Sequence, residues 1–163
     1  MIPADVSQQS VLIVHDDPRI RSRASGLLRK LGHSVELRSA PDAVLDFKSA
    51  GRPDLVLCKL PWCDDIRDIL TQTCPKKHSI QYIQLFSNQS VEQVMDAFNK
   101  ENCDCLPIPF SERTLALSVG RALERRDLIA RNLRTQRRLL RSNDQLEKSL
   151  GALESDAIAG RQL

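Results

Sequence analysis

The chain has 163 residues, a net charge of +3, and 41% hydrophobic and 28% charged residues, an ordinary composition for one globular domain plus an appendage. No apolar run approaches the roughly 18 residues of a membrane span, and residues 1–5 lack the basic and then apolar plan of a signal peptide, so we expect neither feature in this sequence. Five cysteines, an odd number without paired spacing, predict reduced thiols and a cytoplasmic protein.

Strand and helix signals alternate along residues 10–123, beginning with an apolar run at 11–14 that is typical of a strand buried on both faces. Pro18 stands where a helix can begin, and Gly32 ends that helix. The expected strands are 11–14, 34–37, 55–58, 80–86 and 103–106. The expected helices are 18–31, 41–49, 66–73, 91–99 and a last one from 111 to about 162. The residues of the fourth helix expected to face inward are Val91, Val94, Met95 and Phe98.

This alternation predicts an α/β protein with a parallel sheet and helices on both faces. Ligands of such sheets bind at the carboxyl ends of the strands. The residues that follow the first, third, fourth and fifth strands are therefore the candidate site: His15, Asp16, Asp17, Lys59, Phe86, Ser87, Ile108 and Pro109.

Three of these strand ends resemble one known family. The apolar strand that runs into His15-Asp16-Asp17, the strand 55–58 that runs into Lys59, and the Pro107-Ile108-Pro109-Phe110 turn are similar to the receiver domain of bacterial response regulators, over roughly residues 10–123. The resemblance implies a flavodoxin-like, doubly wound, five-stranded parallel sheet. It also implies a role in two-component signal transduction.

The resemblance breaks at the phosphorylation chemistry. Family members hold Mg²⁺ with two acids after the first strand, accept the phosphoryl group on an aspartate after the third, and contact it with a hydroxyl after the fourth and a lysine after the fifth. Carried over by position, the first acid is His15 and the second is Asp16. Lys59 stands at the acceptor position, Phe86 at the hydroxyl position (or Ser87, if the alignment moves by one residue), and Ile108 at the lysine position. Four of the five positions are then altered, and Pro109 is the proline that the family usually holds in cis.

Lys59 changes the electrostatics of the predicted site. Two unit charges near 4 Å interact by roughly 4 kcal/mol at an effective dielectric constant of 20. That energy opposes the binding of a metal ion and favours a Lys59–Asp16 ion pair. In this pair, Lys59 would act as an internal counter-ion. The alternative is that Lys59 extends into solvent and Asp16 caps the following helix. We expect no catalytic residue, no metal and no cofactor in this degenerate site, and hence no enzyme.

The last predicted helix is long, because no proline follows Pro109. Residues 111 to 162 would span roughly 75 Å as a helix. A heptad seam with a slip of one position near Leu140 predicts a parallel homodimeric coiled coil, in which Asn143 pairs with its own copy. The alternative is packing against a further domain. The predicted seam contains Ile129, Leu133, Leu140, Asn143, Leu146, Leu150 and Leu153.

The predicted organisation is a flexible N-terminus (1–9), a degenerate receiver domain (10–123) and a coiled-coil linker helix (124–163) toward a downstream output domain. The predicted function is a phosphorylation-independent pseudo-receiver, a module for protein interaction and dimerisation that regulates that output domain. Two alternatives stay open: a phosphorelay receiver with an unusual acceptor, and nucleic-acid binding through the arginine-rich stretch 121–141. The absence of aromatic residues in that stretch argues against nucleic acid.

Overall fold

The structure is a computed structural model that describes residues 8–46, 53–73, 80–88, 91–100 and 102–161. The chain divides into two compact units, Met1–Arg126 and Asp127–Leu163. Most of the predicted flexible N-terminus lies outside the described residues.

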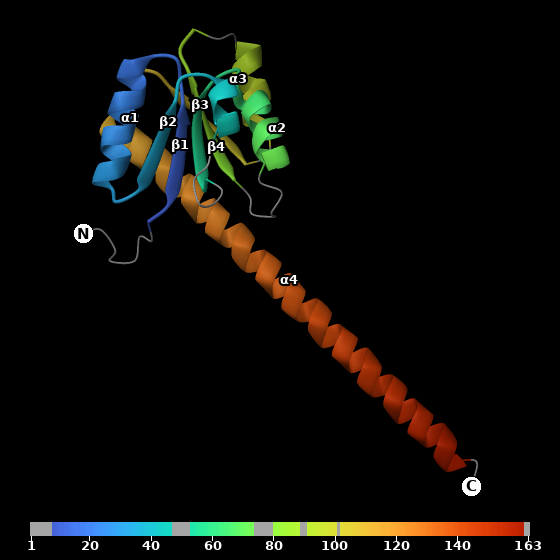
Figure 1. Cartoon of the computed structure of the whole chain (residues 1–163). Helices are drawn as coiled ribbons and strands as arrows, with labels where there is room; N and C mark the ends of the chain where they lie inside the picture. The colour runs from blue at the N-terminus through green and yellow to red at the C-terminus, as the bar shows by residue number, and fades with distance from the viewer. Residues whose placement is uncertain (1–7, 47–52, 74–79, 89–90, 101, 162–163) are drawn as a thin grey trace. The chain divides into compact units, whose positions relative to one another are not determined.

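The first unit is built on one sheet of five parallel strands in the order β2-β1-β3-β4-β5 (Figure 1). Its strands are β1 (Ser10–Val14), β2 (Ser34–Arg38), β3 (Leu55–Lys59), β4 (Gln81–Phe86) and β5 (Cys103–Pro107). The three central strands are almost fully buried, as their continuous apolar sequences predict. The predicted α/β class and doubly wound parallel sheet are confirmed.

Helices cover both faces of the sheet (Figure 1). One core cluster joins the sheet to α1 (Pro18–Lys30) and to the first turns of α4 (Glu112–Arg161). The other joins the opposite face to η1 (Pro41–Asp46) and α2 (Cys63–Thr73), while α3 (Val91–Phe98) lies beside β5. Gly32, at a φ of 93°, allows the chain to leave α1 and enter β2.

Three predicted helix details are corrected. The second expected helix is a 3₁₀ helix over Pro41–Asp46, and residues 47–49 of that prediction lie outside the described residues. The third begins at Cys63, earlier than expected, because the acids of its first turn suit a helix N-terminus. In α3, Val91 and Met95 are 75% and 60% exposed, since the small Ala97 provides the buried contact in their place.

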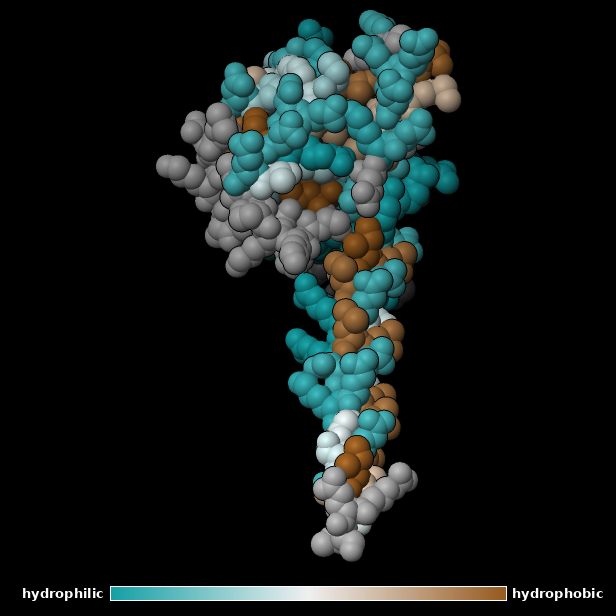
Figure 2. Space-filling model, turned by 90° about the vertical axis from the view of Figure 1, so that its right-hand side faces the viewer, coloured by the Kyte–Doolittle hydropathy of each residue, from teal (hydrophilic) through white to brown (hydrophobic). Residues whose placement is uncertain are grey.

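The second unit is the continuation of helix α4, with no break up to Arg161. Figure 2 shows hydrophobic side chains following one side of this helix and hydrophilic side chains following the other. No described helix of either unit is both long and apolar enough to cross a membrane.

Candidate functional site

The carboxyl ends of the strands frame a cleft of about 420 Å³ in the first unit. The parallel direction of the strands brings residues from distant parts of the sequence to this one edge. Its lining consists of His15, Asp16, Asp17, Ile20, Lys59, Leu85, Ser87 and Ile108. Six of the eight candidate residues from the sequence thus meet in one place, and only Phe86 and Pro109 are not among the lining residues.

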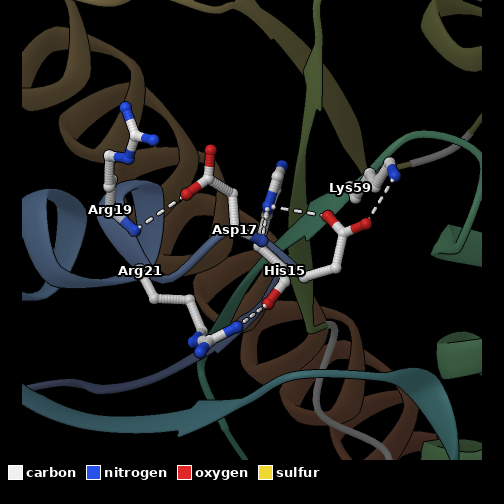
Figure 3. Close-up of polar contacts among 6 residues, drawn as sticks. His15, Asp17, Arg19, Arg21 and Lys59 are labelled. Carbon is white, nitrogen blue, oxygen red and sulfur yellow. Dashed lines mark hydrogen bonds and ion pairs between the residues drawn. The ribbon is translucent and has the colours of Figure 1, made fainter.

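Lys59 and Asp16 form the ion pair that the sequence predicts. The Lys59 ammonium lies at the end of β3 and donates a hydrogen bond to Asp16 Oδ2 at 2.9 Å (Figure 3). That hydrogen bond is the largest influence on the pKa of the Asp16 carboxyl and lowers it. The Lys59 ammonium also lies 5.3 Å from the centre of the Trp62 ring, a cation–π distance. Two partners therefore hold the lysine at the mouth of the cleft.

Asp17 is committed to the helix that follows it. Its carboxylate accepts a hydrogen bond from the backbone N–H of Arg19 at 2.9 Å, which makes Asp17, and not Asp16, the N-cap of α1 (Figure 3). The Arg21 guanidinium donates a hydrogen bond to the backbone carbonyl of His15 and so stabilises the same turn. The alternative in which Asp16 caps the helix is therefore wrong.

His15 is 5% exposed, and burial is the main cause that lowers the pKa of its imidazole. Its Nδ1 accepts a hydrogen bond from the backbone N–H of Asp17 at 3.0 Å, so the single proton of the neutral ring is on Nε2. Asp16 Oδ1 lies 3.2 Å from the same Nδ1. Because Nδ1 already accepts a hydrogen bond, we regard this contact as a close approach to a neutral ring and not as a second ion pair.

Of the two residues that the alignment allows at the hydroxyl position, Ser87 lines the cleft and Phe86 does not. Strand β4 extends through Phe86, which pairs with Pro107 of β5, and its carbonyl accepts from the Ile108 N–H at 2.8 Å. Ser87 is the first residue beyond the strand and lines the cleft. With Ser87 at the hydroxyl position, the altered positions are His15, Lys59 and Ile108; with Phe86 there, they are four.

The last position of the site is apolar. Ile108 lines the cleft where a lysine is expected in the family, and the Ile108–Pro109 peptide bond is cis, as the resemblance implies. The turn after Lys59 is tight as well, with a cis Leu60–Pro61 bond and a hydrogen bond from the Trp62 N–H to the Lys59 carbonyl at 2.7 Å. Helix α2 begins directly after it.

The residues of the cleft do not fit the Mg²⁺ ion that receiver domains hold. Magnesium needs several oxygen ligands in an octahedral arrangement. Among the described residues, the carboxylates that line the cleft are Asp16, which faces an ammonium group, and Asp17, which caps a helix. A second cation beside Lys59 would meet its fixed positive charge.

A second polar cluster, which was not predicted from the sequence, lies at the opposite end of the strands. Arg125 of α4 donates to Gln81 Oε1 at 2.6 Å and pairs with Asp104 at 3.3 Å. Its neighbour Arg126 pairs with Asp54 at 2.6 Å. These contacts join α4 to the beginnings of β3, β4 and β5. In the sequence, Arg125 and Arg126 do not differ from the other arginines of this basic helix. Only their tertiary contacts identify them.

Comparisons with known proteins agree with this architecture. No protein-family model matches the sequence, and no curated protein matches it. Among solved structures, NtrX from Brucella abortus in complex with ADP is similar, with a TM-score of 0.65 and 24% identity over 77% of this chain, which is 28% of the NtrX chain. The chemotaxis protein CheY4 of Vibrio cholerae gives a TM-score of 0.61 and 21% identity, covering 72% of this chain and all of CheY4.

A third neighbour is the signal receiver domain of a modulated diguanylate cyclase from Desulfovibrio desulfuricans, with a TM-score of 0.61 and 23% identity. It covers 75% of this chain and 98% of that domain. The chain has the receiver fold. Since the identities are low, the likeness establishes the fold and leaves the chemistry to be argued from the cleft residues themselves.

Proposed function

We propose that the chain is a cytoplasmic pseudo-receiver of two-component signalling, a protein-interaction and dimerisation module that regulates an output domain without being phosphorylated. The observation that carries this proposal is the Lys59–Asp16 ion pair. It puts a cation where the family has its nucleophile, and it engages Asp16, the described carboxylate of the cleft that does not cap a helix. The cleft therefore contains a constant ion pair in place of a phosphoryl charge that is added and removed.

Phosphoryl transfer through another acid is not supported by the contacts of the nearby carboxylates. Asp17 is the N-cap of α1, and Asp64 pairs with Lys100 at 2.6 Å. Neither stands at the end of β3, the position from which a nucleophile reaches a phosphoryl group in the cleft. Phosphoryl transfer also needs its developing charge neutralised, and Ile108 offers no charge for that purpose.

Helix α3 offers a surface for a protein partner. Val91 and Met95 are largely exposed on it, although their apolar side chains were expected to face the core. Exposed large apolar residues that lie together often mark interaction sites. A partner that binds this helix can influence α4, because α3 contacts β5 and Arg125 of α4 pairs with Asp104 of the same strand.

Helix α4 provides the route to an output domain. It leaves the sheet where Arg125 and Arg126 are tied to three strands, and it continues as the helix of the second unit. A shift of the sheet would therefore be passed on as a change in helix position. We include dimerisation through this helix in the proposal, because its apolar residues have no partner among the described residues of their own unit.

The proposal is tested by exposing the full chain to a small acyl phosphate with Mg²⁺ and measuring the intact mass. We expect no gain of a phosphoryl group. A matched variant that carries Lys59→Asp and Ile108→Lys restores the family's acceptor and lysine on the same fold, and it serves as the positive control. A stable phosphoryl adduct on Asp16 or Asp17 of the unsubstituted chain would show that phosphorylation still operates and would refute the proposal.

A further inference from the structure

The second unit presents an apolar stripe that has no partner among the residues that the structure describes. Along the helix, the large apolar side chains Leu139, Leu146, Leu150 and Leu153 are 59%, 59%, 58% and 66% exposed. Figure 2 shows hydrophobic residues gathered along one side of this helix. Burying a leucine side chain fully is worth about 1.5–3 kcal/mol, so a stripe of this length favours association.

The positions of these leucines follow an unbroken heptad repeat. Alternating steps of three and four residues run the whole length of the unit without a slip, through Ile129, Asn132, Gln136, Leu139, Asn143, Leu146, Leu150, Leu153, Ala157 and Gly160. This seam differs from the one predicted from the sequence, which used Leu133 and Leu140 and needed a discontinuity. A strict heptad repeat maintains a regular left-handed supercoil, and a slip disturbs it.

The charged residues agree with the unbroken seam. Five arginines lie within 131–141, and all of them fall on the three heptad positions that face away from the seam. The Asp144–Lys148 ion pair, at 3.2 Å, also lies on that outer side. Leu133 and Leu140 then flank the seam. Of the large exposed apolar residues of the unit, only Ile158 falls on the outer side.

The amides within the seam decide the direction of the partner. In a parallel, in-register pair, Asn132, Gln136 and Asn143 each face their own copy, where an amide both donates and accepts a hydrogen bond. In an antiparallel pair centred on the seam, Asn143 would face Leu146 and Gln136 would face Leu153. Each buried amide without a partner costs about 1–3 kcal/mol, so the parallel arrangement is favoured.

Like charge does not overturn this preference. A parallel pair brings the two arginine stretches to the same level, but they lie on outer faces, separated by the two helices. At physiological ionic strength the Debye length is about 8 Å, so the repulsion between exposed charges across the pair is largely screened.

We propose that residues 129–160 form a parallel, in-register, two-stranded coiled coil with a second copy of this chain, through the unbroken seam that contains Asn132 and Leu139. This inference rests on the dimerisation included in the proposed function. It specifies the interface, its direction and the residues that belong to it. Leu133 and Leu140 lie beside the seam and not within it.

Cysteine cross-linking of the full chain tests the seam. Leu139→Cys and Leu140→Cys are a matched pair, because these neighbouring leucines are 59% and 68% exposed. Under a mild oxidant we expect Leu139→Cys and Leu146→Cys to give a covalent dimer about tenfold faster than Leu140→Cys, whose sulfur atoms lie too far apart in the proposed pair. The unsubstituted chain measures the background from the native cysteines, and size-exclusion chromatography with light scattering gives the mass of each variant before oxidation.

Each outcome has one meaning. Faster cross-linking of Leu140→Cys than of Leu139→Cys would overturn the unbroken seam in favour of the slipped one. Cross-linking only in a mixture of Leu139→Cys and Leu150→Cys would show an antiparallel pair and overturn the direction. A dimer of correct mass without any cross-link would place the interface elsewhere. A monomeric mass for the unsubstituted chain would refute the dimerisation itself and leave the argument about the cleft untouched.

Discussion

Replacing Lys59 with methionine tests the ion pair on which the proposed function depends. Methionine keeps the length and most of the apolar stem of the side chain and removes its charge. Two unit charges at the observed 2.9 Å interact by about 1.4 kcal/mol in the dielectric of water. Lys59 and Asp16 are 33% and 53% exposed, so side-chain entropy and salt reduce that value. We expect a coupling free energy of about 0.5 kcal/mol, within the range for exposed pairs.

The coupling is measured with a double-mutant cycle of Lys59→Met and Asp16→Asn by urea unfolding at pH 7. It should also depend on pH in a defined direction. The pKa of Asp16 is lowered in the folded state, so its contribution is complete above the ordinary carboxyl range and disappears as the pH falls through the folded pKa. In Lys59→Met, NMR titration of the Asp16 carboxyl should show a higher pKa than in the unsubstituted chain.

Lys100→Met is the matched control, because Lys100 is also 33% exposed and also pairs with an aspartate, at 2.6 Å. It should cost a similar amount of stability and leave the pKa of Asp16 unchanged. If Lys59→Met also left that pKa unchanged, or if the cycle showed no coupling at pH 7, the ion pair would be absent in solution. The electrostatic argument against phosphorylation would then lose its basis.

The remaining predictions concern pH, the helix anchor and the seam. Burial lowers the pKa values of His15 and His33, so the unfolded chain binds protons more readily than the folded chain. The free energy of unfolding should therefore fall as the pH drops below about 6.5. Replacing both histidines with asparagine should flatten this pH dependence in urea unfolding. Arg126→Ala removes a half-buried ion pair and should destabilise the first unit by about 1–3 kcal/mol in thermal unfolding, whereas alanine at the exposed Arg121 should change little. Asn143→Leu should raise the dissociation temperature of the dimer, measured by circular dichroism, and broaden its oligomeric states by light scattering, because a seam amide specifies pairing at a cost in stability.

Much of the first unit could be predicted from local sequence. Continuous apolar runs defined the buried strands, and Pro18 and Gly32 marked the ends of α1. The strand-end residues were identified because a parallel sheet must bring its carboxyl ends together. Helix orientation was harder to predict, as Val91 and Met95 show: hydrophobicity alone does not reveal which side of a short helix finds a neighbour.

The chemical groups of the cleft could be predicted from the amino-acid sequence: a lysine, a histidine and an isoleucine stand at positions where receiver domains have acids and a lysine. Tertiary structure decided how those groups are used. In the turn after β1, Asp17 caps helix α1, and its N–H donates a hydrogen bond to His15. Asp16 therefore pairs with Lys59. Tertiary structure also brought Ser87, and not Phe86, to the lining of the cleft, since Phe86 is still paired with β5 as the last residue of β4. Contacts of this kind depend on where another part of the chain lies, which is a property of the folded sheet and not of any one segment.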